Sequence, residues 1–121
     1  MSITNISILS PNAAYTMLTS TEVSGEVVGE NIVRVEILNP ATGQGIITAI
    51  PAYHHIEEKW LWSTPVNIDL ADGLNTITAT AVDDLDATLD IYVNITKKNI
   101  EIVVLTPDSV ITQTSTSVTV S

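Results

Sequence analysis

The stretch WSTPVNIDLADGLNTITATAVD, residues 62–83, decides the fold class. In its second half Ile77, Ala79 and Ala81 alternate with threonines. Successive side chains of a strand point to opposite faces, so this alternation predicts a strand over residues 75–82 with its apolar face buried. An Asp-Gly turn signal precedes that strand.

Working outward, the same alternation recurs along most of the chain, and helical periodicity is almost absent. The segments between Gly, Pro, Asn and Asp turn signals predict strands over residues 3–9, 21–29, 32–38, 45–50, 60–70, 75–82 and 88–96. About seven short strands at this spacing are typical of an all-β fold, an antiparallel β-sandwich.

The alternation also predicts which residues face the core. The inward positions are Val23, Gly25, Val27, Val33, Val35, Ile37, Trp60, Trp62, Val66, Ile68, Leu70, Ile77, Ala79, Ala81, Leu89, Ile91, Val93 and Ile95. Charged residues such as Arg34 and Glu36 fall on the opposite face.

Residues 62–83 resemble the central signature of bacterial immunoglobulin-like (Ig-like) domains of the glucodextranase type. The shared pattern is an aromatic residue, an alternating strand to Leu, and then x-Gly-x-Asn-x-Ile-x-x-x-Ala-x-Asp. Val23-Ser24-Gly25 is similar to the second strand of that family, and the likeness covers most of residues 3–96. Such modules occur in bacterial cell-surface proteins, extracellular glycosidases and phage structural proteins. The resemblance implies an Ig-like sandwich and is a poor guide to function.

Two segments depart from the family pattern. Residues 51–59 look like an insertion, and Asp84-Leu85-Asp86 replaces the usual glycine-containing turn before the last strand.

The end of the sequence repeats its beginning. Residues 6–12 return as residues 102–108, with an offset of 96 residues between Pro11 and Pro107. We therefore expect an Ig-like sandwich over residues 1–99, with residues 100–121 either opening a second repeat or forming a strand available to a neighbour. Pairing with a neighbouring chain is favoured, because residues 6–9 already take the equivalent place within the domain.

Composition excludes several classes of function. The 121 residues include no cysteine, which removes disulfides and thiolate metal sites. Four basic against fourteen acidic residues give a net charge of −10, which argues against nucleic-acid binding. No apolar run approaches the roughly 20 residues of a membrane span, and residues 1–5 do not resemble a secretion signal.

The sequence does not predict an enzyme. Serines and threonines are many, yet no convincing general base and no Gly-x-Ser-x-Gly elbow accompany them. The acidic residues fall on outward faces or turns, where two carboxylates do not meet across a pocket.

Metal binding is left open at one place. Asp83, Asp84 and Asp86 have the oxygen chemistry that Ca²⁺ prefers, although a polar turn explains the same residues. Histidines 54 and 55, with Glu57 and Glu58, are weaker candidates for zinc, because adjacent histidines in a strand point to opposite faces. We expect no cofactor, with Ca²⁺ as the one alternative.

Tyr53 and Trp60 are the candidate ligand-binding residues. Flat aromatic rings stack on carbohydrate, and either residue could equally contact a protein partner. Trp62, two residues further on, is predicted to lie in the core.

These observations favour a non-catalytic structural or adhesive Ig-like module from a tandem-repeat bacterial extracellular or cell-surface protein. Its partners would be neighbouring Ig-like modules or identical subunits. Two alternatives remain: a virion or filament subunit that assembles by strand addition, and an accessory carbohydrate-binding domain of a secreted glycosidase.

Overall fold

The computed structural model describes residues 3–98, and the regular secondary structure of this part consists of strands. The strands are β1 (Ile3–Ser10), β2 (Tyr15–Thr16), β3 (Ser20–Thr21), β4 (Ser24–Gly29), β5 (Ile32–Leu38), β6 (Ile47–Ala49), β7 (Ala52–His54), β8 (Lys59–Ser63), β9 (Ile68–Asp69), β10 (Gly73–Asp83) and β11 (Thr88–Lys97). Within residues 3–98 no helix has the length and apolarity needed to cross a membrane.

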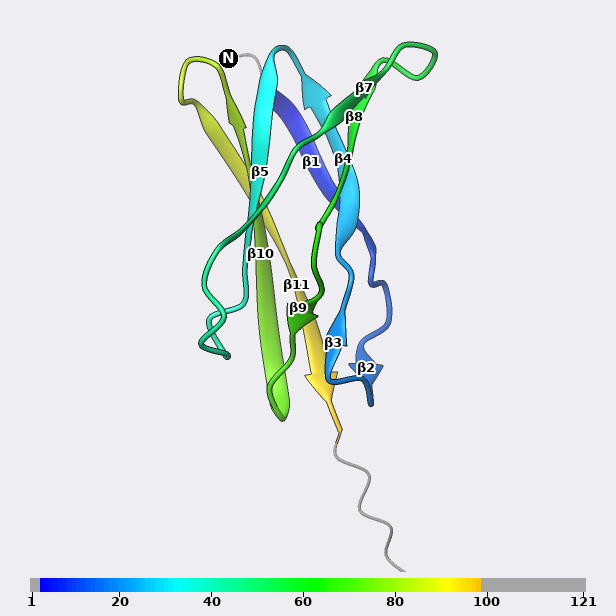
Figure 1. Cartoon of the computed structure of the whole chain (residues 1–121). Helices are drawn as coiled ribbons and strands as arrows, with labels where there is room; N and C mark the ends of the chain where they lie inside the picture. Colours follow the sequence, from blue (N-terminus) through cyan, green and yellow to red (C-terminus); the bar gives the residue numbers. More distant parts are fainter. Residues whose placement is uncertain (1–2, 99–121) are drawn as a thin grey trace, which may run out of the picture.

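The strands form two main layers, which confirms the predicted all-β sandwich (Figure 1). One sheet has the order β1-β4-β8-β7 and the other β2-β11-β10-β5-β6, while β3 and β9 form a small pair. The pairings are antiparallel except for that of β2 with β11. Buried side chains from both sheets meet in a single apolar core.

Trp62 is buried in the core, and it lies opposite Gly25 in the pairing of β4 with β8. A Cβ atom at position 25 would overlap the backbone carbonyl of Ser7 and lie 2.7 Å from the Trp62 ring. Only glycine therefore lets β1 and the indole approach β4 this closely. This contact explains the glycine in the Val-Ser-Gly segment.

Val33 is the first correction to the predicted core, because it is 41% exposed. In the pairing of β5 with β10, Arg34 lies opposite Val82 and Ile32 lies opposite Asp83. Val33 is thus an extra residue in β5, a β-bulge that inverts the alternation beyond it. Ile32 takes the buried place instead.

Val66 is the second correction, because it is 52% exposed. The predicted strand over residues 60–70 breaks at Pro65, which has no N–H to donate to a sheet. Before the break, Thr64 donates to the carbonyl of Val23 and its hydroxyl accepts the Val23 N–H, at 2.9 and 3.1 Å. The described residues contain eleven strands where the sequence predicts about seven, because two predicted strands are broken and because β2 and β7 lie in predicted connections.

Two buried asparagines replace apolar packing near the β9–β10 turn. The Asn75 amide donates to the carbonyls of Ala71, Gly73 and Ile95, and its oxygen accepts from Asn39 at 2.9 Å. A buried amide with this many partners fixes the turn, which gives Asn75 a structural role.

The chain enters and leaves the sandwich at opposite ends (Figure 1). β1 begins beside the β4–β5 turn, whereas β11 ends beside β2. We call the end with residues 30–31, 55–58 and 84–87 the head, and the end where β11 finishes the tail.

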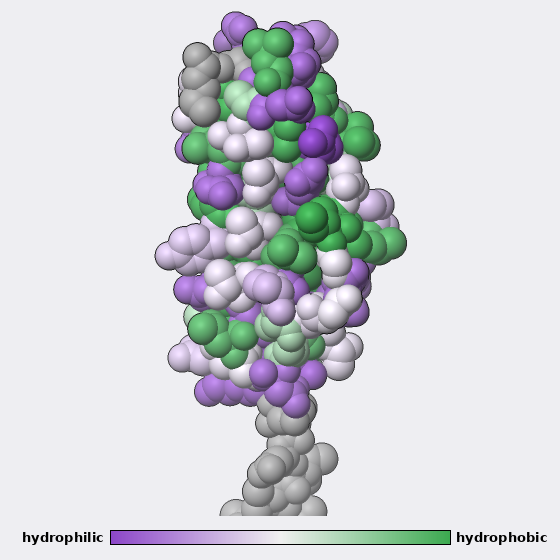
Figure 2. Space-filling model, turned by 90° about the vertical axis from the view of Figure 1, so that its left-hand side faces the viewer, coloured by the Kyte–Doolittle hydropathy of each residue, from purple (hydrophilic) through white to green (hydrophobic). Residues whose placement is uncertain are grey.

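The side of the sandwich that lies to the left in Figure 1 has a mixed surface. Figure 2 shows hydrophilic and hydrophobic residues interspersed along it, with hydrophilic residues fringing both ends. Scattered apolar residues of this kind are ordinary on a solvent-facing surface.

Candidate functional site

Tyr53 and Trp60, the predicted ligand-binding residues, lie side by side on the β7–β8 hairpin at the head. They are partners in the register of the two strands, and their ring centroids are 5.1 Å apart at an interplanar angle of 62°. Tyr53 is 41% exposed, and the Trp60 indole is half-buried. The two predicted residues therefore share one surface.

The turn after β4 completes this site. The indole N–H of Trp60 donates a 3.0 Å hydrogen bond to the carbonyl of Gly29. Both aromatic side chains line an open hollow of about 390 Å³ together with Gly29, Glu30 and Asn31. Aromatic surface beside a carboxylate and an amide can stack on a sugar ring and hydrogen-bond its hydroxyls.

Lys59, next to Trp60, is held by two carboxylates. Its ammonium nitrogen lies 2.6 Å from Glu26 and 3.1 Å from Glu57. The hydrogen bond from Lys59 lowers the pKa of Glu57, and the hydrogen bonds to Glu26 and then Glu57 raise the pKa of Lys59. Both ion pairs involve residues outside the hollow, and the acidic residue that lines the hollow is Glu30.

The two neighbouring histidines have different contacts, and His54 stabilises the turn between β7 and β8. Nδ1 of His54 accepts the backbone N–H of Glu57 at 3.3 Å, and the carbonyl of His54 accepts the N–H of Glu58 at 2.8 Å. His55 instead packs edge-on against Tyr53, with ring centroids 5.0 Å apart. Among residues 3–98 no three His, Cys, Asp or Glu side chains form a group able to hold a metal ion.

The acidic turn at residues 83–86 is likewise organised by backbone hydrogen bonds. Asp83 is buried, and its Oδ1 accepts the N–H groups of Leu85 and Ala87, each at 2.9 Å. Asp86 has a φ of +62°, the left-handed conformation that aspartate tolerates better than most residues. Asp84 and Asp86 are exposed. Calcium binding here stays a prediction.

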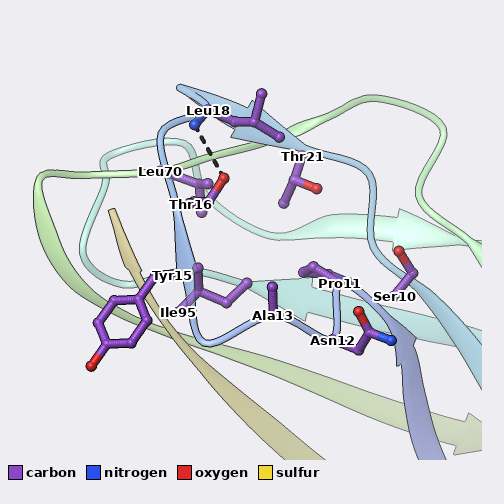
Figure 3. A pocket seen from close by; sticks show the side chains of 10 residues that line it. All are labelled: Ser10, Pro11, Asn12, Ala13, Tyr15, Thr16, Leu18, Thr21, Leu70 and Ile95. Carbon is purple, nitrogen blue, oxygen red and sulfur yellow. Dashed lines mark hydrogen bonds between the residues drawn. The ribbon is translucent and has the colours of Figure 1, made fainter. Parts of the chain in front are cut away.

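A second surface, which the sequence analysis missed, lies at the tail. Tyr15, Met17 and Leu18 are 60%, 64% and 58% exposed. Beside them is a hollow of about 210 Å³, and Figure 3 shows Ile95 and Leu70 within it and the Tyr15 ring pointing outward. An apolar run in a connection between two predicted strands was the signal that could have revealed this surface.

No protein-family model matches the chain, and no curated protein matches its sequence. The assignment of function therefore depends on the residues and the geometry described above.

Proposed function

We propose that the chain is a non-catalytic, Ig-like structural module of a tandem array in a bacterial extracellular or cell-surface protein. The observation that carries this proposal is the placement of the ends, since β1 begins at the head and β11 finishes at the tail (Figure 1). A module with this geometry adds its full length to an array and transmits force along its strands.

The parallel pairing of β2 with β11 supports a mechanical role. Thr96 donates to the carbonyl of Ala14 and Lys98 to that of Thr16, both at 2.9 Å. Force applied to the two chain ends pulls β2 and β11 in opposite directions along their length. Both hydrogen bonds then bear the force at the same time. Breaking them together needs a higher force than breaking bonds one after another.

Pulling the full chain through its two ends in single-molecule force spectroscopy tests this proposal. We expect one cooperative unfolding event for the sandwich. Lys98→Pro removes the N–H that Thr16 accepts and should lower the unfolding force, while Lys98→Ala keeps that N–H and should leave the force unchanged. Extension without a distinct unfolding event, or equal forces for the two variants, would contradict the mechanical role.

Carbohydrate binding is the second candidate function, and the hollow lined by Tyr53 and Trp60 favours it. Titration with soluble polysaccharides should quench tryptophan fluorescence, since Trp60 is accessible while Trp62 is only 3% exposed. Tyr53→Ala should abolish the change. Tyr92→Ala, which removes a still more exposed aromatic side chain from β11, should not.

The virion or filament alternative assigns residues 100–121 to a strand on a neighbouring chain, and these residues lie outside the described part. Within residues 3–98, the outer edge of β11 pairs only with the two-residue β2 at Thr96 and Lys97. Such an edge could receive a strand.

A further inference from the structure

The tail carries an apolar surface across which the chain leaves the sandwich. We call Tyr15, Met17, Leu18 and Lys98 the tail face. All three of its apolar side chains are more than half exposed. The Lys98 ammonium lies 4.4 Å from the centroid of the Tyr15 ring, and its backbone is bonded to Thr16. The described chain therefore reaches this face at Lys98.

The head carries the two most exposed apolar side chains of the described chain. Ile56 is 89% exposed at the tip of the β7–β8 connection, and Leu85 is 82% exposed in the β10–β11 turn. Figure 1 shows both connections at the end of the sandwich opposite to the tail. The Asp84 N–H donates to the Asn31 carbonyl at 3.0 Å, which joins the β10–β11 turn to the β4–β5 turn.

The two ends differ in charge, because the head is acidic whereas the tail carries both Lys97 and Lys98 and the carboxylates of Asp69 and Asp72. Four exposed carboxylates at the head make no ion pair within residues 3–98: Glu30, Glu58, Asp84 and Asp86. At the tail, Lys97 pairs with Asp72 at 2.9 Å, whereas Lys98 makes no ion pair within the described chain. An acidic, apolar-tipped end thus matches an apolar end with an uncompensated cation.

The spacing of the sequence repeat leaves no room between consecutive modules. With an offset of 96 residues, the counterpart of Ile3, where β1 begins, is Asn99. β11 ends at Lys97, so Lys98 alone would join one sandwich to the next. A single residue spans only about 3.5 Å, and two sandwiches joined in this way must touch.

We propose that the tail face docks the head of a second copy of this sandwich. Ile56 and Leu85 of the second copy would cover Tyr15, Met17 and Leu18, and its carboxylates would surround Lys98. The inference rests on the proposed role as a tandem module, because it describes the junction between consecutive modules. The contact is head-to-tail and so propagates along an array without closing on itself.

The faces are small, and separate copies should bind each other weakly. Each face offers only a few apolar side chains, below the size of a stable interface. In an array, the short covalent link gives neighbouring modules an effective concentration of about millimolar or more. At that concentration even a weak contact is populated. The test therefore uses the full chain at concentrations up to about 1 mM, the same range.

Sedimentation velocity of two blocked variants tests the proposal. Met17→Asp/Leu18→Asp blocks the tail face, and Ile56→Asp/Leu85→Asp blocks the head. We expect the unmodified chain to self-associate with rising concentration and each blocked variant alone to associate at least about tenfold more weakly. A mixture of the two should form dimers and stop there, because the unblocked head of one variant pairs with the unblocked tail of the other and only blocked faces remain.

Ile50→Asp is the matched control, because Ile50 is 74% exposed and lies between β6 and β7, away from both faces. It should associate like the unmodified chain. Thermal unfolding of every variant checks that the sandwich is intact, which the exposure of the changed residues favours.

Two results would overturn the docking proposal. Blocked variants that associate as strongly as the unmodified chain would place self-association elsewhere, and a mixture that stays monomeric would exclude a head-to-tail contact. Neither result bears on the unfolding force of the single sandwich. Failure of the docking proposal and failure of the structural-module proposal are therefore distinguishable.

Discussion

Trp60 and Trp62 lie two residues apart on the same face of β8, yet they belong to different parts of the molecule. Trp62 is 3% exposed in the middle of the sandwich, and its indole N–H has no hydrogen-bond partner in the described structure. Trp60 lies at the head, where its N–H reaches Gly29 and its ring meets Tyr53. Strand alternation assigns a face to both residues, and only the position along the strand separates core from surface.

The unpaired indole shows which effect dominates in the middle. An unsatisfied buried donor costs about 1–3 kcal/mol. Burying roughly 200 Å² of aromatic surface contributes about 5 kcal/mol at 25 cal/mol per Å². Packing of Trp62 therefore outweighs its lost hydrogen bond, whereas the half-buried Trp60 keeps its own.

The largest expected effect is that of Gly25→Ala, which tests the tight packing of the middle. The new methyl group would overlap the Ser7 carbonyl and press on the Trp62 ring, and the backbone of β1 cannot move aside without breaking its pairing with β4. We expect the loss of cooperative unfolding in a urea titration, since strain of this kind removes much of the roughly 5–15 kcal/mol of a domain. Gly43→Ala, where no atom lies within 4 Å, should unfold normally. A stable Gly25→Ala protein would show that β1 can shift.

The next largest effect is that of Ile77→Ala. Ile77 is fully buried in β10, and its truncation leaves a cavity between the sheets. We expect the free energy of unfolding to fall by about 2–5 kcal/mol. Leu74→Ala, at a position on the same strand that is 60% exposed, should cost far less. Similar losses for the two variants would argue against a core between the sheets.

The middle of the sandwich was predictable from sequence to a greater extent than its ends. Alternation identified Val35, Ile37 and Ile77 because period two holds wherever the pairing is regular. It failed at Val33 because an extra residue in one strand inverts every side chain beyond it, and neighbouring sequence does not mark the bulge.

The candidate site was predicted only in part. Tyr53 and Trp60 could be chosen by residue type, but their contact depends on the register of β7 with β8. The tail face was missed because exposure of an apolar connection depends on which strands cover it, and alternation carries no such information. For Asp83 the sequence left a calcium ligand and a polar turn as alternatives, and the hydrogen bonds of its Oδ1 to the backbone of its own turn could not be predicted from residue type alone.

A smaller effect is expected at that turn. Asp83→Ala leaves the N–H groups of Leu85 and Ala87 without their acceptor, and we expect a loss of about 1–3 kcal/mol in the free energy of unfolding. Asp84→Ala, at an exposed position, should change little.

Saturating calcium should leave the melting temperature of the unmodified chain nearly unchanged. A clear rise that disappears in Asp83→Ala/Asp86→Ala would instead establish a calcium site.

The smallest expected effect concerns the ion pairs at the head. The lowered pKa of Glu57 means that its contribution to stability is present above its ordinary value of 4.5 and is lost as the pH falls through the lowered value. The raised pKa of Lys59 means that its contribution is present below 10.5 and is lost as the pH rises through the raised value. Lys59→Met should therefore differ most from the unmodified chain at neutral pH, and the two should converge in acid well below 4.5. Urea midpoints across this range measure the difference. Lys98→Met, at the tail and without an ion pair in the described chain, should show no such convergence. A difference for Lys59→Met that persists unchanged into acid would show that Lys59 acts through the packing of its apolar stem and not through its charge.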